Sequence, residues 1–592
     1  MGIVKKKYLH VCLILLFVSS NTYSQSDYSK YMQVKKLFLQ ERHEEVKNSN
    51  ISLSSNSEFL PYFNFYISVS LYKTGNLEES LDNFNELKKK YTNWPQIQDV
   101  NYWIVKILIE IDNLTDALSV FSTISDPDIK SNLYEIIDPK ISSVSSFYKL
   151  QNLYNKYPDN ISLAKYYGRQ LLNEFLDEDV QNEIKEILRI VDRNELFISS
   201  YEKFKIAVLL PMMYESLENT YYIRNNKFIM DLYAGIMYSL SNLDSTNSLI
   251  EIFPFDTKRD PDVVNEIIDS GYLDGMDLII GPLYSKPVSI IKQYCLENKL
   301  LMINPLSSNH EIIEDNNYSL LFNPSLKTIA NKAADYSIDR FQENKNVIIF
   351  YEKKSSDSLI AKIYENRLDS SNFNIIYSKG VSLEDSRLIL DSLTNSYEEI
   401  LSDSLYDAIK SISGRIVKDG RGIDGLDTLY KYEEKFYIED DSIGHVFVSS
   451  KNSLFASNVI SAVDIRNDTI SVIGFDEWLD FDLITIDQFQ NLDISLISTS
   501  FINLESDEYL ELQDYYIENY RNKISKNFIL GSELMNFIFE IVSNYGKYFQ
   551  FGLRNENFIP GNLFYGFKYL ENNDNQIVPI VSVDSSKIKL DN

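Results

Sequence analysis

Three short runs of the sequence decide the fold: IAVLLPM at 206–212, LIIGPLYS at 278–285 and LLMINPLSS at 300–308. Each begins as an apolar run and then meets a proline, which is typical of a buried β-strand followed by a turn. A further strand is expected at 249–255, and apolar residues recur at helical spacing over 229–240. Strands that alternate strictly with helices predict a parallel sheet covered on both faces.

The same alternation restarts after Asn323-Pro324 and predicts a second α/β lobe. Four more strands are expected, with helices between them: 347–351, 373–377, 446–449 and 470–473. A long acidic stretch, 383–444, separates the second of these strands from the third. We expect this stretch to be a mobile surface insertion, because long segments between elements run over the surface.

The first part of the chain, about 25–200, shows helical patterns and almost no strand pattern. One unit runs from Leu71 through Gly75, Ser80 and Phe84, and a second copy follows 37 residues later, with Ala117 at the place of Ser80. A small residue there lets two antiparallel helices approach closely. This spacing resembles the tetratricopeptide repeat, and arrays of that kind usually bind protein segments.

The N-terminus resembles a secretory leader. Lysines 5–7 precede an apolar run, 11–18, that is too short to span a bilayer, and cleavage is expected after Ser24. The formal charge of the chain is −29, which makes nucleic acid and anionic membranes poor partners. Only Cys295 remains after cleavage, so no intrachain disulfide is expected, and a periplasmic location is predicted.

The residues point to no enzyme and to no cofactor. The three histidines of the mature chain, His43, His310 and His445, lie far apart and form no metal-binding spacing. The sequence contains neither a GxSxG nucleophile elbow nor a GxxxxGK phosphate loop. We therefore expect a binding protein.

Seven motifs in a fixed order now suggest a family. They are IAVLLPM, DLYAGI, FDT, a DP pair at a helix start, LIIGPLYS, LLMINPLSS and LLFNPS, between residues 206 and 325. This order is similar to that of type I periplasmic-binding proteins, above all the leucine/isoleucine/valine-binding receptors. The resemblance covers roughly 203–592. It implies two lobes that the chain crosses three times, lobe one being 203–323 plus 495–550 and lobe two 324–494 plus 551–592.

The candidate ligand-binding residues follow strands. In parallel sheets ligands bind beyond the carboxyl ends of the strands, where the turns after the first, third and fourth strands lie. The resemblance implies that hydroxyls there hold a ligand carboxylate, that Asp476 accepts an ammonium group, and that FVSS at 447–450 stands where the family has an aromatic residue. The candidates are Met213, Tyr284, Ser285, Leu306, Ser307, Ser308, Ser449 and Asp476. For the serines, simple helix capping is the alternative; for Asp476 it is a solvated loop acid.

Two functions of different class remain open. The first is a receptor that binds a small amphoteric ligand, an amino acid or a peptide-like molecule, for transport or sensing. The second is a scaffold that binds an envelope protein, because helical repeats followed by a type I binding fold are also the architecture of the lipoprotein activator of a peptidoglycan synthase. The expected order is a leader at 1–24, repeats at 25–200 and the binding fold at 203–592.

Overall fold

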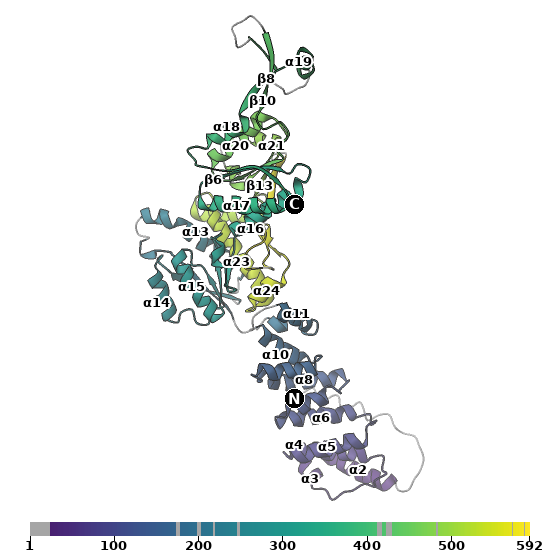
Figure 1. Ribbon diagram of the computed structural model, residues 1–592. Helices are drawn as coiled ribbons and strands as arrows, with labels where there is room; N and C mark the ends of the chain where they lie inside the picture. Colours follow the sequence, from purple (N-terminus) through teal and green to yellow (C-terminus); the bar gives the residue numbers. More distant parts are fainter. Residues whose placement is uncertain are drawn as a thin grey trace. The chain divides into compact units, whose positions relative to one another are not determined.

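A computed structural model describes residues 24–591 except 173–177, 198–202, 217–219, 245–248, 411–416, 422–428, 481–482, 571 and 585–586. The chain divides into a helical unit that ends at Leu196 and an α/β unit that begins at Phe197 (Figure 1). The predicted leader lies almost wholly outside the described residues. Within the described part of the chain, no helix combines the length and the apolar character that crossing a membrane requires.

The helical unit consists of successive helices, and the predicted hairpins are confirmed. Gly75 (φ 83°) and Asp112 (φ 64°) both adopt a left-handed conformation at the turns, so Asp112 takes the role of the glycine. Ser80 and Ala117 are fully buried where the helices meet. The helices are α2 Ser24–Leu39, α3 His43–Lys47, α4 Leu60–Lys73, α5 Leu77–Lys90, α6 Ile97–Glu110, α7 Leu114–Phe121, α8 Pro127–Ser142, α9 Phe147–Lys156, α10 Ile161–Leu171, α11 Glu178–Ile187 and α12 Arg193–Phe197.

Lobe one of the α/β unit contains a five-stranded parallel sheet in the order β2-β1-β3-β4-β5. The strands are β1 Phe204–Leu210, β2 Ile250–Asp256, β3 Leu278–Ile280, β4 Leu301–Asn304 and β5 Ser319–Leu321. Its helices are α13 Thr220–Leu243, α14 Pro261–Asp269, α15 Ser285–Asn298, α22 Asp507–Tyr520, α23 Lys526–Tyr545 and α24 Phe549–Asn555. A hairpin of two short strands, β14 Ile559–Pro560 and β15 Gly566–Phe567, also belongs to this lobe. Four of these strands were predicted to within two residues.

Lobe two repeats the arrangement. Its seven-stranded sheet has the order β17-β16-β13-β12-β11-β6-β7, and the first five strands along the chain are parallel, in the same spatial order as those of lobe one. Every residue of β11 and β12 is buried, so both faces of the sheet are covered, as predicted.

The elements of lobe two are β6 Asn346–Glu352, β7 Asn374–Val381, β11 His445–Ser449, β12 Ser471–Phe475, β13 Ile494–Ile497, β16 Ile580–Asp584 and β17 Lys587–Leu590, with α16 Leu326–Arg340, α17 Ser355–Ser370, α18 Arg387–Thr394, α20 Ser453–Arg466 and α21 Ile486–Asn491.

The crossings between the lobes lie elsewhere than the sequence suggested. The expected crossing at 494/495 falls inside β13, which pairs with β12 and β16 and so belongs to lobe two. The segment from residue 551 to about 577 was assigned to lobe two, yet Phe567 packs on Phe322 and on Phe537 of α23, both in lobe one. Aromatic packing therefore keeps this segment on lobe one.

The acidic stretch 383–444 is more ordered than a loop. Its described residues include α18 and a three-stranded antiparallel sheet with one helix: β8 Ser396–Ile400, α19 Asp403–Lys410, β9 Val417–Arg421 and β10 Leu429–Phe436. Charged residues break up the apolar pattern of these strands, such as the two adjacent glutamates of SYEEI at 396–400, and this hid the strands in the sequence.

Candidate functional site

The carboxyl edge of the lobe-one sheet is organised by Asn304, the last residue of β4. Its side chain is fully buried. The amide Nδ2 donates to the carbonyl of Pro282 at 2.8 Å, and Oδ1 accepts from the backbone N–H groups of Leu306 at 3.2 Å and Ser307 at 2.8 Å. One side chain thus ties the turn after β3 to the turn after β4, and it occupies two N–H groups that a ligand carboxylate could otherwise use.

A second chain of contacts links the turns after β1, β2 and β3. Asn226 Nδ2 donates to the carbonyl of Met212, and Arg259 Nη2 donates to Asn226 Oδ1 at 2.9 Å. The Arg259 guanidinium lies 5.0 Å from the centre of the Tyr284 ring, a cation–π contact. Met213, beside Met212, has a left-handed backbone (φ 54°). The structure therefore brings Met213 and Tyr284 to one edge and adds the cation Arg259.

The predicted serines of lobe one differ in their surroundings. Capping of α15 was the alternative to ligand binding for Ser285, but the N-cap residue is Tyr284, and Ser285 is the exposed first residue of the helix. Ser307 Oγ accepts from the backbone N–H of Asn309 at 3.1 Å, and Ser308 provides its carbonyl to the N–H of Leu326 at 3.0 Å. The edge at Ser308 therefore adjoins the start of α16 in lobe two.

The corresponding edge of lobe two carries acidic groups. Glu352, the last residue of β6, is 4% exposed; its carboxylate accepts from Ser450 Oγ at 3.1 Å and lies 2.8 Å from the Lys354 ammonium. This hydrogen bond with Glu352 raises the pKa of Lys354. Ser449 is fully buried, and its hydroxyl donates to the carbonyl of Asp357, so this candidate points into lobe two.

Asp476 follows β12 and lies in a largely buried position, not in a solvated loop. Ser498 Oγ donates to its Oδ2 at 2.5 Å. Burial, together with the neighbouring Glu477, raises the pKa of Asp476 from 3.8 to about 7. Glu477 pairs with Lys451, and its other oxygen, Oε2, is buried and has no hydrogen-bond partner among the described residues.

One ion pair joins the two lobes beside this edge. Lys526 Nζ, in the first turn of α23 in lobe one, lies 2.8 Å from Asp480 Oδ2 in lobe two. Asp476 and Glu477 also contribute to the raised pKa of Lys526, after the larger effect of the Asp480 hydrogen bond. The acidic edge of lobe two therefore faces lobe one.

Asp476 should make stability depend on pH. A carboxyl group whose pKa is about 7 in the folded state and about 4 in the unfolded state binds its proton more tightly when folded. Its contribution of about 4 kcal/mol is present below pH 4, is lost as the pH rises from 4 to 7, and stays lost above pH 7. Urea unfolding of wild type and Asp476→Asn across this range measures it, and the difference between the two curves should be flat if Asp476 does not titrate there.

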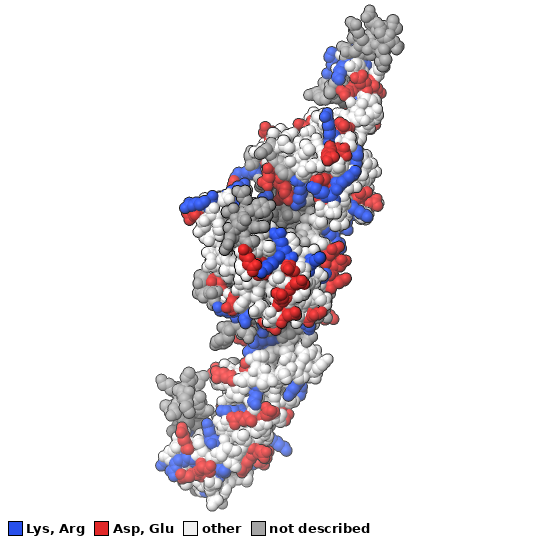
Figure 2. Space-filling view, turned by 90° about the vertical axis from the view of Figure 1, so that its left-hand side faces the viewer, with Lys and Arg blue, Asp and Glu red and all other residues white. Residues whose placement is uncertain are grey.

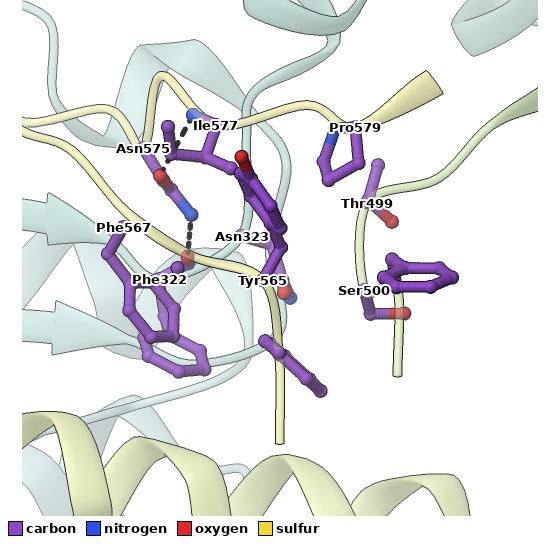
Figure 3. Close-up of a pocket in the computed structure, with 12 residues that line it drawn as sticks. Phe322, Asn323, Thr499, Ser500, Tyr565, Phe567, Asn575, Ile577 and Pro579 are labelled. Atoms are coloured by element: carbon purple, nitrogen blue, oxygen red, sulfur yellow. Dashed lines mark hydrogen bonds between the residues drawn. The ribbon is translucent and has the colours of Figure 1, made fainter. Parts of the chain in front are cut away.

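A pocket of about 250 Å³, which includes space open to solvent, lies at the crossings and not between the two edges (Figure 3). It is lined by residues of all three crossing segments and of the β14–β15 hairpin, among them Phe322, Thr499, Tyr565 and Ile577. Asn575 Nδ2 donates to the carbonyl of Phe322, and Asn575 Oδ1 accepts from the N–H of Ile577. None of the eight predicted site residues lines this pocket.

The surface shows no broad region of one charge sign on the face in Figure 2, where acidic and basic side chains are interspersed over both units. Within the described ranges, no group of three or more His, Cys, Asp or Glu residues is placed to hold a metal ion.

Sequence reasoning missed three side chains of the two edges: Arg259, Asn304 and Glu352. Asn304 and Glu352 each directly follow a predicted strand, and Arg259 immediately precedes the Asp260-Pro261 helix start, so their places could be read from the sequence. Their roles depend on contacts with other strands and helices, which the sequence does not display.

No family model matches the chain. An uncharacterized protein of Methanocaldococcus jannaschii is 24% identical over 133 residues, which is 22% of this chain and 31% of that protein, so the match spans about a third of the relative.

Solved structures with similar folds include full-length LpoA from Haemophilus influenzae (12% identity, 97% of this chain, 99% of that chain, TM-score 0.44). A putative branched-chain amino acid ABC transporter protein from Rhodospirillum rubrum matches with 10% identity over 66% of this chain and 100% of that one, TM-score 0.44. An ABC transporter substrate-binding protein from Desulfitobacterium hafniense in complex with Leu matches with 12% identity over the same shares, TM-score 0.38. The matches differ in extent: the match to LpoA covers nearly the whole of this chain, and those to the two transporter proteins cover about two thirds of it.

Proposed function

We propose that the α/β unit is a non-enzymatic receptor, exported to the periplasm, that binds a small amphoteric ligand such as an amino acid or a short peptide. The observation that supports this most is the opposite chemistry of the two sheet edges. Lobe one offers the Arg259 cation and the start of α15, whereas lobe two offers the Asp476 carboxyl group and the second oxygen of Glu477, beside a Glu352 that Lys354 already neutralises.

This arrangement suits a ligand with a carboxylate at one end and an ammonium group at the other. A guanidinium and the free N–H groups of a helix start both favour a carboxylate. On the opposite side, the unpartnered Oε2 of Glu477 and the neighbouring Asp476 can accept from an ammonium. In each sheet the strand order reverses between the first and the third parallel strand, so the carboxyl edge of each sheet contains a topological switch point, where ligands of open α/β sheets bind.

A ligand screen tests the proposal. The mature chain, 25–592, is heated with amino acids, short peptides and muropeptides, and a ligand at about 100 times its Kd should stabilise the α/β unit by about 2.7 kcal/mol. Arg259→Ala should weaken that ligand at least about tenfold, through loss of a charge-assisted hydrogen bond. Arg521→Ala, which removes an exposed arginine of the same lobe, serves as the matched control. The receptor proposal fails if no compound shifts the melting temperature, or if Arg259→Ala and Arg521→Ala behave alike.

Ligand affinity should fall as the pH falls through about 7. Asp476 attracts an ammonium group only when its carboxyl group is ionised. At a pH below the raised pKa of Asp476, the ligand must therefore displace the proton of this carboxyl group. We expect the Kd to rise by up to about tenfold per pH unit below 7 and to be nearly constant above it. Titration calorimetry at pH 5.5 to 8.5 measures this, and Asp476→Asn should give weaker binding with a flat profile. A sloping profile that survives in Asp476→Asn would assign the proton to another group.

The second candidate function, a scaffold that regulates cell-wall synthesis, is favoured by one feature that ligand binding leaves unexplained. The helical unit carries stacked hairpins whose first helices contact one another: Tyr72 of α4 bonds Glu110 of α6, and Asp138 of α8 accepts from Tyr166 of α10 at 2.7 Å. Such arrays can bind protein segments. Crosslinking of the full chain in cells, followed by identification of a peptidoglycan synthase or its regulator, tests this function. Recovery of no envelope protein would count against it.

A further inference from the structure

The antiparallel sheet inserted into lobe two forms a small structure of its own, which we call the arm and define as residues 395–410, 417–421 and 429–437 (Figure 1). Helix α19 covers one face of the sheet. Leu401, Tyr406 and Ile409 form a separate apolar cluster with Val417, distinct from the main core of lobe two. The arm therefore has its own packing, and lobe two does not need it to complete its core.

The base of the arm is fixed. The backbone N–H of Tyr437 donates to the carbonyl of Asn395 at 3.0 Å and closes the two ends. The Arg466 side chain is fully buried beside this closure and donates to the carbonyls of Leu393 and Ile438 and to the Asp468 carboxylate, the last at 2.6 Å. A buried guanidinium with these partners holds both ends of the arm on α20.

Strand β8 lies at the edge of the arm, and its outer side is unpaired in the described sheet. The N–H of Leu401 donates to Lys431, and the carbonyl of Asn395 accepts from Tyr437, so odd-numbered residues face β10. In an antiparallel pair the alternate residues face away. The N–H and C=O groups of Ser396, Glu398 and Ile400 therefore point outward, and the Ile400 side chain is 63% exposed.

The charged residues of β8 determine which kind of strand can pair with its outer side. A second copy is disfavoured, because the antiparallel register that overlaps all of β8 sets Glu398 opposite Glu398, and like charges placed directly opposite destabilise a sheet. On the inner side, Glu434 stands opposite Glu398 but already binds Ser396 Oγ at 2.6 Å and Lys418 Nζ at 3.3 Å. Lys418 also attracts Glu398, but its ammonium is held by Glu434, so an added strand can place a basic side chain directly opposite Glu398.

We propose that the arm is a docking element that adds an extended strand of a partner protein to the edge of β8. The partner strand carries a lysine or arginine opposite Glu398 and an apolar residue against Ile400. Backbone hydrogen bonds supply the pairing, and the charge of Glu398 supplies the preference for a basic strand. This inference is independent of the ligand between the two sheet edges.

The test uses the mature full chain and a short synthetic strand peptide with two lysines among valines and threonines. Its twin has glutamate at both lysine positions. We expect the basic peptide to bind at least about tenfold more tightly than the acidic twin, and Glu398→Lys to reverse this order. Ile400→Pro should abolish binding of both, because it removes an outward N–H while leaving the bonds to β10 in place. Ile400→Thr, which keeps the N–H, is the matched control.

Three results would overturn the inference: equal binding of the two peptides, binding that Ile400→Pro leaves intact, or concentration-dependent dimers that Glu398→Lys does not affect. Thermal unfolding of each variant shows whether the arm and lobe two remain folded. The ligand screen on the same variants keeps the two proposals separate, since arm variants should bind the small ligand as wild type does.

Discussion

Replacement of Asp574 by alanine is expected to lower the free energy of unfolding of the α/β unit by about 3 to 5 kcal/mol. The side chain is fully buried at a crossing between the lobes. Its carboxylate accepts from the backbone N–H of Ser325 at 2.8 Å, from the Ser325 hydroxyl, and from Thr328 Oγ1 at 2.5 Å. Alanine would leave the Ser325 N–H and at least one of the two hydroxyls buried without an acceptor, since the hydroxyls of Ser325 and Thr328 can bond only each other, and each such group costs about 1 to 3 kcal/mol.

The position of these donors makes the loss larger than that of an ordinary hydrogen bond. Ser325 is the N-cap of α16, the first helix of lobe two, and Asp574 reaches it from the last crossing, about 250 residues later. One carboxylate therefore fastens two of the three crossing segments together. Removing it should weaken the cap and loosen the crossing in one step.

Urea unfolding of the mature chain measures this effect, with Asp339→Ala as the matched control. Asp339 is an exposed aspartate on the same α16, and its removal should change stability by no more than about 0.5 kcal/mol. Asp574→Asn should give an intermediate loss, because an amide keeps one acceptor and adds donors where donors already converge. A loss below about 1 kcal/mol in Asp574→Ala would mean that water replaces the carboxylate at the crossing.

Apolar runs closed by proline or glycine predicted the strands well. β1, β3 and β11 are buried at nearly every position, and such runs stand out in a sequence. β5 was missed because only two of its three residues are apolar, and β8 because most of its residues face solvent and two of its five are glutamates. Local sequence reports local burial, so short or exposed strands leave little trace in it.

For the candidate site, too, the sequence predicts some features and not others. The edges of the sheets could be predicted, because the end of a buried run marks the end of a strand. Which side chains face outward could not be predicted, and Ser449 and Asp476 show why. Ser449 is turned inward by the carbonyl of Asp357, and Asp476 is buried beside Ser498, which lies 22 residues further along the chain. Such neighbours meet only in the folded protein.

The second large effect is expected where helices α13 and α23 of lobe one pack closely against each other at two glycines. Gly531 of α23 faces α13, and a Cβ atom added there would lie 2.0 Å from the carbonyl oxygen of Leu232. Gly235 of α13 faces α23 in the same way, with its Cβ 2.1 Å from the carbonyl oxygen of Phe528. Backbone atoms at such distances cannot move aside as a side chain would, so the two helices must separate.

Gly531→Ala should therefore destabilise the α/β unit by about 3 kcal/mol or more, at the upper end of the cost of overpacking a core. Separation would also strain the buried hydrogen bond of 2.6 Å between Ser239 and Ser532. The sign of the change is decisive, since Gly→Ala in an uncrowded helix interior should stabilise by about 1 kcal/mol. Chemical unfolding measures it, with Glu540→Ala on the exposed side of α23 as control. A gain in Gly531→Ala would show that α13 and α23 do not meet at these glycines. If the double variant Gly235→Ala/Gly531→Ala loses less stability than the sum of the two single losses, both glycines belong to one contact.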